Sequence, residues 1–407
     1  MKADSYKICD NVYWVGVLDW DIRNYHGYSL TGTTYNCYLV FGDEKVALID
    51  NVYPGKSAQF WGRIKDAFEN EGREFKIDVM IQNHIEKDHS GSLVEVLKKF
   101  PDIEVYCSKK ADPGLKKHYH ELTDCEFNIV GTGDEVSLGN KTLAFVNAPM
   151  LHWSDSMFTM LMEDGILFSN DAFGQHVCLS DRLDVDVNPE ILEKITQKYY
   201  ANLITPLSPL VRRKMAELTD LGLVEKTKMI APCHGQIWTK PETVLELYTK
   251  WSNGVCKDKI TLIYDTMHYS TQSMAYAIAE GIMSEDVEVK MYFMHEDDKS
   301  DVVADILDSK AIFVGSPTMM NKAFPGIGDV MYYLDCLSFD KTTYKKKAIA
   351  FGSKGWSGGA NKKIKTDLET AGFEVIEETD LIFVPTEDEL EDCYELGKKV
   401  AKMIKSE

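Results

Sequence analysis

The stretch QNHIEKDHSGS, residues 82–92, concentrates two histidines, a glutamate and an aspartate within six positions. It follows the apolar run IDVMIQN (77–83) and precedes SLVEVLKKF (92–100), whose apolar residues have helical spacing. Positions two apart on an α-helix point about 200° away from each other, so these donors converge only on a loop between strand and helix. By itself the stretch fits a solvated acidic turn as well as a metal site. The four donors are His84, Glu86, Asp88 and His89.

Three other loops carry a potential metal ligand at the same kind of position. Each follows a predicted strand, namely KTLAFVN (141–147), GILFSN (165–170) and KMIAPC (228–233). The ligands on these loops are His152, Asp171 and His234. Because such sheets gather ligands beyond the carboxyl ends of their strands, four loops with donors at that end predict one shared site. Seven donors exceed the needs of one tetrahedral ion and suit two ions with a carboxylate between them.

The composition limits the class of protein. The chain has 407 residues, 44% of them hydrophobic and 27% charged, which predicts a soluble protein of two domains. A net charge of −20 argues against nucleic acid as a partner, and no apolar run approaches the roughly 20 residues that span a bilayer. Nine cysteines without a C-x-x-C pair favour a cytoplasmic location and metal ligands that are nitrogen and oxygen.

The pattern of elements changes after Gly254. Before it, β-rich runs mix with helices, whereas strands and helices alternate strictly from KDKITLIYD (257–265) to LIFVPT (381–386). Uniformly apolar strands in such an alternation predict a parallel sheet that is covered on both faces. We therefore predict two domains, residues 1–254 and 255–407, with the boundary where a long helix ends on this glycine.

Three loops of the second region are rich in hydroxyl groups and glycine. They lie in LIYDTMHYSTQSMA (262–275), VGSPTMMNKAFPG (314–326) and FGSKGWSGGA (351–360), each after a predicted strand. Hydroxyls and free amides at the start of a helix suit a phosphate, and glycines let the backbone approach a flat ring. An ordinary capped turn also explains the first loop by itself. A response-regulator-like domain would need an acidic pocket here instead.

The metal motif and the second region together resemble a known family. A strand-loop H-x-[HE]-x-D-H followed by His, Asp and His resembles the metallo-β-lactamase fold, whose hydrolases usually carry histidine where this chain has Glu86. With a flavodoxin-like region behind it, the whole chain resembles the flavodiiron proteins (A-type flavoproteins). The resemblance implies an α/β chain with an N-terminal metallo-β-lactamase-like αββα sandwich and a C-terminal flavodoxin-like doubly wound parallel sheet.

The resemblance also implies roles for individual residues. One iron would be held by His84, Glu86 and His152, the other by Asp88, His89 and His234, with Asp171 as the bridge. His176, His26 and Tyr25 are candidates for orienting a ligand or delivering a proton. The three loops resemble the family's FMN site, although TMHYSTQ replaces the T-G-N-T-like run of short flavodoxins. The implied FMN residues are Thr266, Met267, His268, Tyr269, Ser270, Thr271, Ser316, Pro317, Thr318, Met319, Met320, Asn321, Ser353, Lys354, Gly355, Trp356, Ser357, Gly358 and Gly359.

The implied activity is the reduction of dioxygen to water at a diiron centre, with electrons that pass through FMN. The flavin loops and the acidic balance look most like the methanogen branch, whose donor is reduced coenzyme F420. A separate rubredoxin is the runner-up donor, and nitric oxide is the alternative substrate in the same family. The family's head-to-tail arrangement implies a homodimer. Two other classes stay open, a zinc hydrolase with a decayed flavodoxin region and a flavin carrier with a metal-free domain.

Overall fold

The computed structural model describes residues 1–406 and divides into two compact units. Unit 1 comprises residues 1–196 and 213–247, and unit 2 comprises residues 197–212 and, among the described residues, 248–406. Residues 248–254, which we assigned to the first domain, therefore pack with the second unit. The domain boundary after residue 254 stays a prediction about independently folding parts. Among the described residues, no helix combines the length and the apolarity that a bilayer crossing requires.

Unit 1 contains two large β-sheets and two short two-stranded ladders. The first has the order β1-β2-β7-β8-β9-β10-β11 and the second the order β12-β13-β14-β15-β16. The strands of the first are β1 (Tyr6–Cys9), β2 (Val12–Trp14), β7 (Tyr38–Phe41), β8 (Val46–Ile49), β9 (Val79–Gln82), β10 (Glu104–Ser108) and β11 (Asn128–Val130). Those of the second are β12 (Glu135–Ser137), β13 (Thr142–Asn147), β14 (Met157–Leu161), β15 (Ile166–Asn170) and β16 (Met229–Pro232). Short ladders pair β3 (Val17–Asp19) with β6 (Thr33–Tyr35) and β4 (Asn24–Tyr25) with β5 (Tyr28–Ser29).

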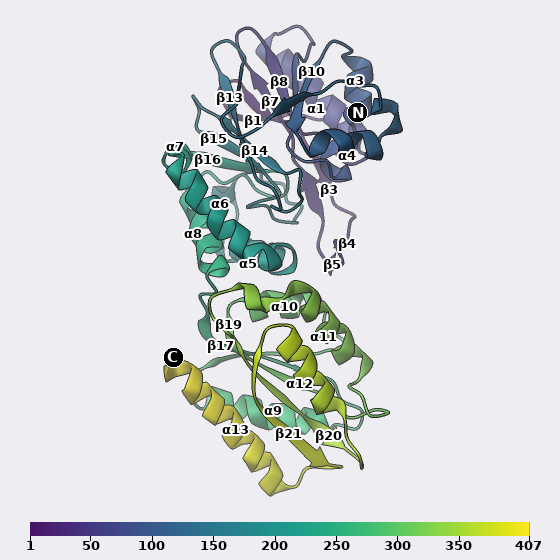
Figure 1. The fold of residues 1–407 in the computed structure, drawn as a ribbon, viewed down its shortest axis with the longest axis vertical. Coiled ribbons are helices and arrows are strands. Elements are labelled where there is room, and N and C mark those ends of the chain that lie inside the picture. Colours follow the sequence, from purple (N-terminus) through teal and green to yellow (C-terminus); the bar gives the residue numbers. More distant parts are fainter. Residues whose placement is uncertain (407) are drawn as a thin grey trace. The chain divides into compact units, whose positions relative to one another are not determined.

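The alternation of apolar residues decides how these sheets pack. On β7, Tyr38 and Val40 contribute to the core that also contains residues of the second sheet, while Leu39 and Phe41 face the helices. Both faces of this strand are buried because successive side chains of a strand point to opposite faces. The helices are α1 (Ser57–Glu71), α2 (Lys87–Ser90), α3 (Leu93–Lys99), α4 (Ala111–His118), α5 (Pro189–Tyr199), α6 (Ser208–Asp220), α7 (Leu223–Lys226) and α8 (Pro241–Ser252). Two sheets between helical layers give the expected αββα sandwich (Figure 1).

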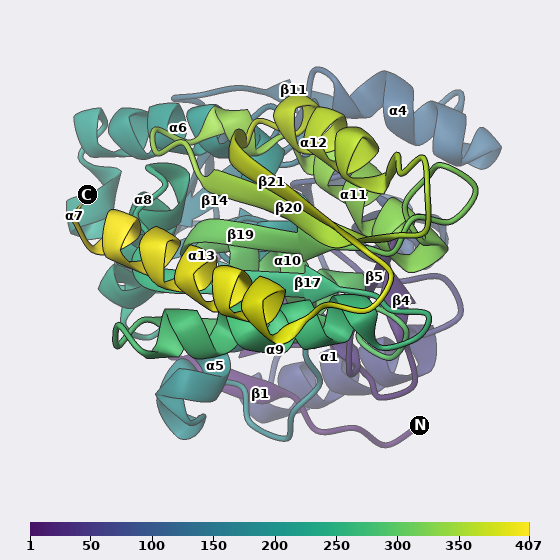
Figure 2. The same cartoon turned by 90° about the horizontal axis from the view of Figure 1, so that it is seen from below.

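Unit 2 holds a parallel sheet of order β18-β17-β19-β20-β21. Its strands are β17 (Lys257–Tyr264), β18 (Glu288–Phe293), β19 (Ser309–Gly315), β20 (Lys347–Lys354) and β21 (Glu374–Ile382). Helices α9 (Ser270–Met283) and α13 (Glu387–Ser406) cover one face, and α10 (Lys299–Leu307), α11 (Pro325–Leu337) and α12 (Ala360–Thr370) the other (Figure 2). The order reverses between β17 and β19, so the doubly wound sheet is confirmed and a crevice forms at its switch point.

The predicted strand LIFVPT is wrong beyond Ile382. Pairing of β21 with β20 ends at the partners Lys354 and Ile382, and Phe383 then adopts a left-handed φ of 58°. A strand cannot continue through such a residue, since it turns the backbone out of the extended conformation. The apolar segment 383–384 is therefore an exposed loop, with Phe383 62% and Val384 75% exposed.

A buried ion-pair cluster at the start of β17, an inner strand of the parallel sheet, is expected to make unit 2 sensitive to acid. Lys259, 3% exposed, lies 2.9 Å from Asp305 and pairs with Asp308, which Lys257 also contacts at 2.9 Å. Burial acts to raise the pKa of Asp308, but the two lysines hold it below its ordinary value. Ionised Asp308 therefore stabilises the fold at pH values above the unfolded-state pKa of about 3.9. This stabilisation is lost as the pH falls through the lower pKa of the folded state.

Asp308→Asn is expected to lower the free energy of unfolding by about 2 kcal/mol at neutral pH, because it leaves a buried ammonium with one carboxylate fewer. The difference from the wild type should shrink as the pH falls below about 4. Urea unfolding at several pH values measures both effects. Asp329→Asn removes an exposed partner of Lys299 and should change stability by less than about 0.5 kcal/mol. A difference in the free energy of unfolding between the wild type and Asp308→Asn that did not vary with pH would contradict this account.

Candidate metal centre

The motif of residues 84–89 is part loop and part helix. His84 lies just beyond β9, and Glu86 immediately precedes the single turn α2, on which Asp88 and His89 lie. The expectation that all four donors sit on a loop is therefore wrong for the last two. The turn forms because the amides of His89 and Ser90 donate to the carbonyl of Glu86 at 3.0 and 2.9 Å. Since the turn starts only after Glu86, the earlier donors can still point at the later ones.

One group of predicted ligands gathers around Glu86. Its Oε2 atom lies 3.5 Å from Nε2 of His84 and 3.4 Å from Nε2 of His152. The side chains of the two histidines are 0% and 7% exposed, and that of the glutamate is 12% exposed. Three donor atoms from two distant segments of the chain thus face one another in a buried pocket.

A second group gathers around Asp88. Its Oδ2 lies 3.1 Å from Nε2 of His234, and its Oδ1 lies 3.3 Å from Nε2 of His89. All three side chains are 1% exposed. This group is as compact as the first and more deeply buried.

Asp171 stands between the two groups. Its Oδ2 lies 3.5 Å from Nε2 of both His84 and His152, whereas its Oδ1 lies 3.2 Å from Nε2 of His89 and 3.5 Å from Nε2 of His234. Each oxygen therefore serves a different group. The structure brings all seven predicted ligands into one site with the division into two sets that the resemblance implied. Their role as metal ligands stays a prediction.

Several of these buried atoms lack a hydrogen bond. They are Nε2 of His84, Oε2 of Glu86, both carboxylate oxygens of Asp88 and Nε2 of His152. A buried polar atom without a hydrogen bond costs about 1–3 kcal/mol, so such a concentration needs an explanation. Ligands about 2.0–2.2 Å from a shared ion lie roughly 3 Å apart, which matches the spacings found here. The chemistry and the spacing of the donors both fit a pair of divalent cations.

The charge state of the site favours cations. Burial acts to raise the pKa of Glu86, but the close imidazoles of His152 and His84 lower it to about 2. Burial opposes ionisation of Asp171 as well, yet His89 and the other histidines hold the pKa of this carboxyl well below its ordinary value. Both carboxyl groups are therefore ionised at neutral pH and present negative charge to the pocket.

Two contacts outside the seven residues hold histidine rings in place. Nδ1 of His84 lies 2.8 Å from Oδ2 of Asp155, and Nδ1 of His234 lies 2.6 Å from the carbonyl oxygen of Thr34. Such contacts turn the remaining ring nitrogen toward a metal and fix the ring's orientation. Sequence reasoning missed Asp155, although it follows His152 by only three positions.

The three candidates for supporting roles differ in their contacts. The Tyr25 hydroxyl donates to Oε1 of Glu86 at 3.3 Å, and Nε2 of His26 lies 3.3 Å from the same oxygen. His176 lies behind the site, with its Nδ1 2.8 Å from Oγ1 of Thr33 and its ring 4.4 Å from that of His234. Tyr25 and His26 thus contact a carboxylate oxygen of the predicted ligand Glu86, whereas His176 packs its ring against that of the predicted ligand His234.

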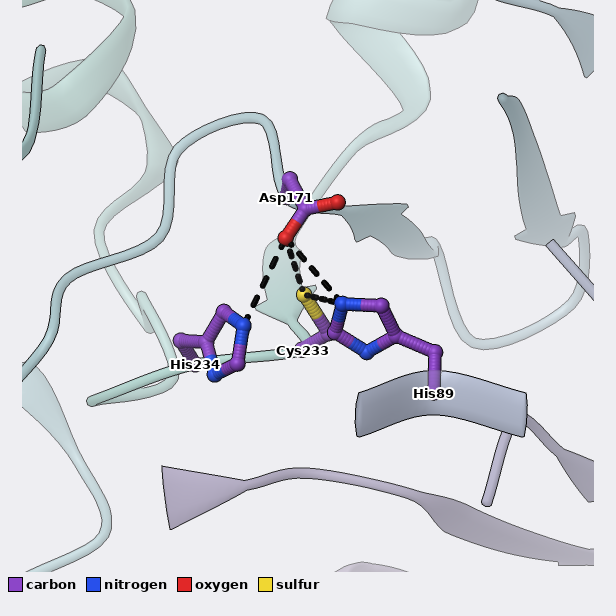
Figure 3. A group of neighbouring side chains, drawn as sticks. All are labelled: His89, Asp171, Cys233 and His234. Atoms are coloured by element: carbon purple, nitrogen blue, oxygen red, sulfur yellow. Dashed lines mark hydrogen bonds and ion pairs between the residues drawn. The ribbon is translucent and has the colours of Figure 1, made fainter. Parts of the chain in front are cut away.

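A cysteine that the sequence analysis did not consider also reaches the site. Cys233 lies beside His89, Asp171 and His234, and the four residues offer donor atoms within 4.8 Å of one another (Figure 3). Burial raises the pKa of its thiol well above the ordinary value. Its position directly before the predicted ligand His234 could have indicated that it reaches the site. The lack of a C-x-x-C pair instead predicted nitrogen and oxygen ligands only.

The three hydroxyl- and glycine-rich loops of unit 2 line one cavity of about 460 Å³. The predicted residues in its lining are Thr266, Met267, His268, Ser270, Pro317, Thr318, Met319, Met320, Ser353, Lys354, Gly355 and Trp356. The remaining predicted residues belong to the same loops but not to this lining, and they are Tyr269, Thr271, Ser316, Asn321, Ser357, Gly358 and Gly359. Phe383 and Val384 complete the lining, and sequence reasoning missed both because it assigned them to a strand.

Comparisons with known proteins cover the whole chain. The family model described as "ODP family beta lactamase" matches residues 33–235, and the one described as "Flavodoxin" matches residues 262–397. The chain is 61% identical to coenzyme F420H(2) oxidase of Methanocaldococcus jannaschii, over 98% of this chain and 97% of the relative. It is 40% identical to nitric oxide reductase of Moorella thermoacetica, over 98% of each chain. The structure of the flavodiiron protein from Giardia intestinalis aligns with a TM-score of 0.91 at 31% identity, over 99% of this chain and 97% of that one.

Proposed function

The chain belongs to the flavodiiron protein family, and from this premise we propose that it reduces dioxygen to water with electrons that pass through FMN to two iron ions. The proposed electron donor is reduced coenzyme F420, in keeping with the name of the relative from Methanocaldococcus jannaschii. The observation that carries the proposal is the pair of buried donor groups that share Asp171, one oxygen to each group.

The donor set favours iron over the zinc of a hydrolase. In the proposal, one iron would be held by His84, Glu86 and His152, the other by Asp88, His89 and His234, and Asp171 would contribute to both sites. Glu86 supplies a hard, negatively charged oxygen where the hydrolases of this fold carry an imidazole, and such a ligand suits an ion that cycles between Fe(II) and Fe(III). When bound, two ferrous ions and reduced FMN together supply the four electrons that the reduction of dioxygen to water requires.

The chain's own residues would control protons at the site. His26 is the more solvent-accessible of the two groups on Oε1 of Glu86, with 23% of its side chain exposed. Burial lowers the pKa of this imidazole, so it is mostly neutral at pH 7 and can accept a proton from water and pass it inward. The Tyr25 hydroxyl, whose pKa burial raises, stays protonated and holds Glu86 in place as a donor. His26 thus serves as the inlet for protons, and Tyr25 positions Glu86 beside it.

The cavity of unit 2 is the proposed FMN site. Ser270 is the first residue of α9, where free backbone amides favour a phosphate. Gly355 lets the backbone come close to a ring, and Trp356, 85% exposed, offers a broad aromatic surface at the mouth. The remaining predicted FMN residues lie on the same three loops, outside the lining of the cavity. We also propose head-to-tail homodimers, which the family uses to bring flavin and iron together, and a cytoplasmic location.

Nitric oxide is a second candidate substrate, because a relative that matches 98% of this chain is named nitric oxide reductase.

The decisive experiment mixes the purified protein anaerobically with reduced coenzyme F420 or reduced rubredoxin and then admits O₂ or NO. We expect rapid oxidation of coenzyme F420 with O₂. Rapid oxidation of reduced rubredoxin, without oxidation of reduced coenzyme F420, would change the assigned donor, and turnover with NO alone would change the substrate. Metal analysis that found zinc and no flavin would instead favour the hydrolase.

Phe383 should contribute to the affinity for FMN. Its ring lines the cavity and lies near Gly355, where an added Cβ would be 3.3 Å from the ring edge. Phe383→Ala is expected to raise the Kd for FMN about tenfold, because an aromatic wall stabilises a flat ring by about 1.4 kcal/mol. Quenching of FMN fluorescence measures the affinity. Phe75→Ala removes a partly exposed ring of unit 1 and should leave the Kd unchanged; equal affinities for all three proteins would exclude this role of Phe383.

A further inference from the structure

Cys233 lies among His89, Asp171 and His234 (Figure 3). Its Sγ atom is 3.1 Å from Oδ1 of Asp171, 3.7 Å from Nε2 of His89 and 3.8 Å from Oδ1 of Asn170. The residue is 2% exposed, and its backbone is fixed on both sides, since its amide donates to Asn170 at 3.0 Å and its carbonyl accepts from Asn36 at 2.7 Å. The thiol is therefore held against the carboxylate and cannot turn into solvent.

The shortest of these contacts distinguishes between two roles for the sulfur. A thiolate that bound a metal would add a negative charge 3.1 Å from an ionised carboxylate oxygen, and the two anions would repel each other. A thiol in the same place donates its S–H to that oxygen, which is an attractive contact. Because Asp171 is the acceptor nearest to the sulfur, the geometry favours donation over ligation.

We propose that Cys233 is a positioning residue that makes the bridging carboxylate unsymmetrical, an inference that rests on the proposed diiron function. The thiol donates to Oδ1 of Asp171, the oxygen that faces His89 and His234, and the other oxygen receives no such donation from it. A hydrogen bond withdraws negative charge from the oxygen that accepts it, so Oδ1 is the weaker metal ligand. The iron held by Asp88, His89 and His234 is then the more easily reduced of the two.

Two substitutions of Cys233 test this role. Cys233→Ala removes the donor, whereas Cys233→Ser keeps a donor in nearly the same place. In Cys233→Ala we expect two irons still to bind. At a fixed potential, the ferric-to-ferrous ratio of the iron held by Asp88, His89 and His234 should rise about tenfold. This rise corresponds to a reduction potential that is lower by about 59 mV for a one-electron couple. Cys233→Ser should remain close to the wild type. Redox titration followed by EPR and Mössbauer spectroscopy measures the ratio for each iron.

Three outcomes would overturn the inference. One is an unchanged ferric-to-ferrous ratio in a Cys233→Ala variant that still binds two irons. Another is a rise in this ratio that is equally large in Cys233→Ser and Cys233→Ala. The third is an iron–thiolate charge-transfer band in the wild type, which would make the sulfur a ligand. The infrared difference spectrum between the wild type and Cys233→Ser reports the hydrogen bond independently of iron. The S–H stretching band that is lost in the variant should lie at lower frequency than the band of the other eight cysteines. A wild type that held no iron would refute the proposed function, while this band would still decide whether the thiol donates.

Discussion

Asp171→Asn is expected to reduce the rate of donor oxidation under O₂ by a factor on the order of 10³. Among the described residues, Asp171 is the one carboxylate whose two oxygens face different donor groups. Asparagine has nearly the same shape, but it offers a single neutral oxygen and replaces the other with an amide that cannot bind a cation. One of the two ions loses a ligand, and the site loses a negative charge. Iron analysis and the initial rate of coenzyme F420 oxidation measure the effect.

Asp184→Asn is the matched control for this substitution. Asp184 is a buried carboxylate of unit 1 that accepts hydrogen bonds from the amides of Thr239 and Lys240 and has no contact with the metal site. Its replacement can lower stability, but it should leave the iron content and the rate per iron unchanged. If Asp171→Asn retained two irons and full activity, the two donor groups would not act as one centre.

Gly359→Ala has the second large effect that we expect, a rise of about 100-fold in the Kd for FMN. Gly359 has a φ of +132°, which a residue with a side chain rarely adopts, and an added Cβ would lie 2.5 Å from the carbonyl oxygen of Asn321. The strain and the overlap together amount to about 3 kcal/mol, and they force apart two of the loops that flank the cavity. Donor oxidation should fall in parallel and recover partly when FMN is added in excess.

Gly328→Ala serves as the control for a glycine-to-alanine change in the same unit. Gly328 lies within α11, and an added Cβ there would meet no atom within 4 Å. Alanine should raise the free energy of unfolding by about 0.5–1 kcal/mol, since glycine is the poorer helix former, and it should leave FMN affinity unaltered. Equal affinities in the two variants would mean that the loop around Gly359 does not support the flavin.

The periodicity of the chain was sufficient to predict much of the fold. Largely apolar runs such as residues 260–264 became central strands of the parallel sheet, because both faces of that sheet are covered. Errors arose where a local pattern met a special backbone conformation. The run 381–386 looks like a strand, yet the left-handed φ of Phe383 ends it and turns two apolar side chains toward the cavity. The turn Lys87–Ser90 is too short to show a helical period.

The sequence by itself determined the kinds of donor and the strand ends from which they project, since both depend on neighbours in the chain. Only the tertiary structure decided which atoms face each other. The two oxygens of Asp171 serve different groups, and the Cys233 thiol touches one of them, because strands from separate parts of the chain end beside one another. The contacts of Asp171 with His84 and His89 depend on how two sheets pack together, and its contact with Cys233 depends on the pairing of β15 with β16. No local pattern of residues records either arrangement.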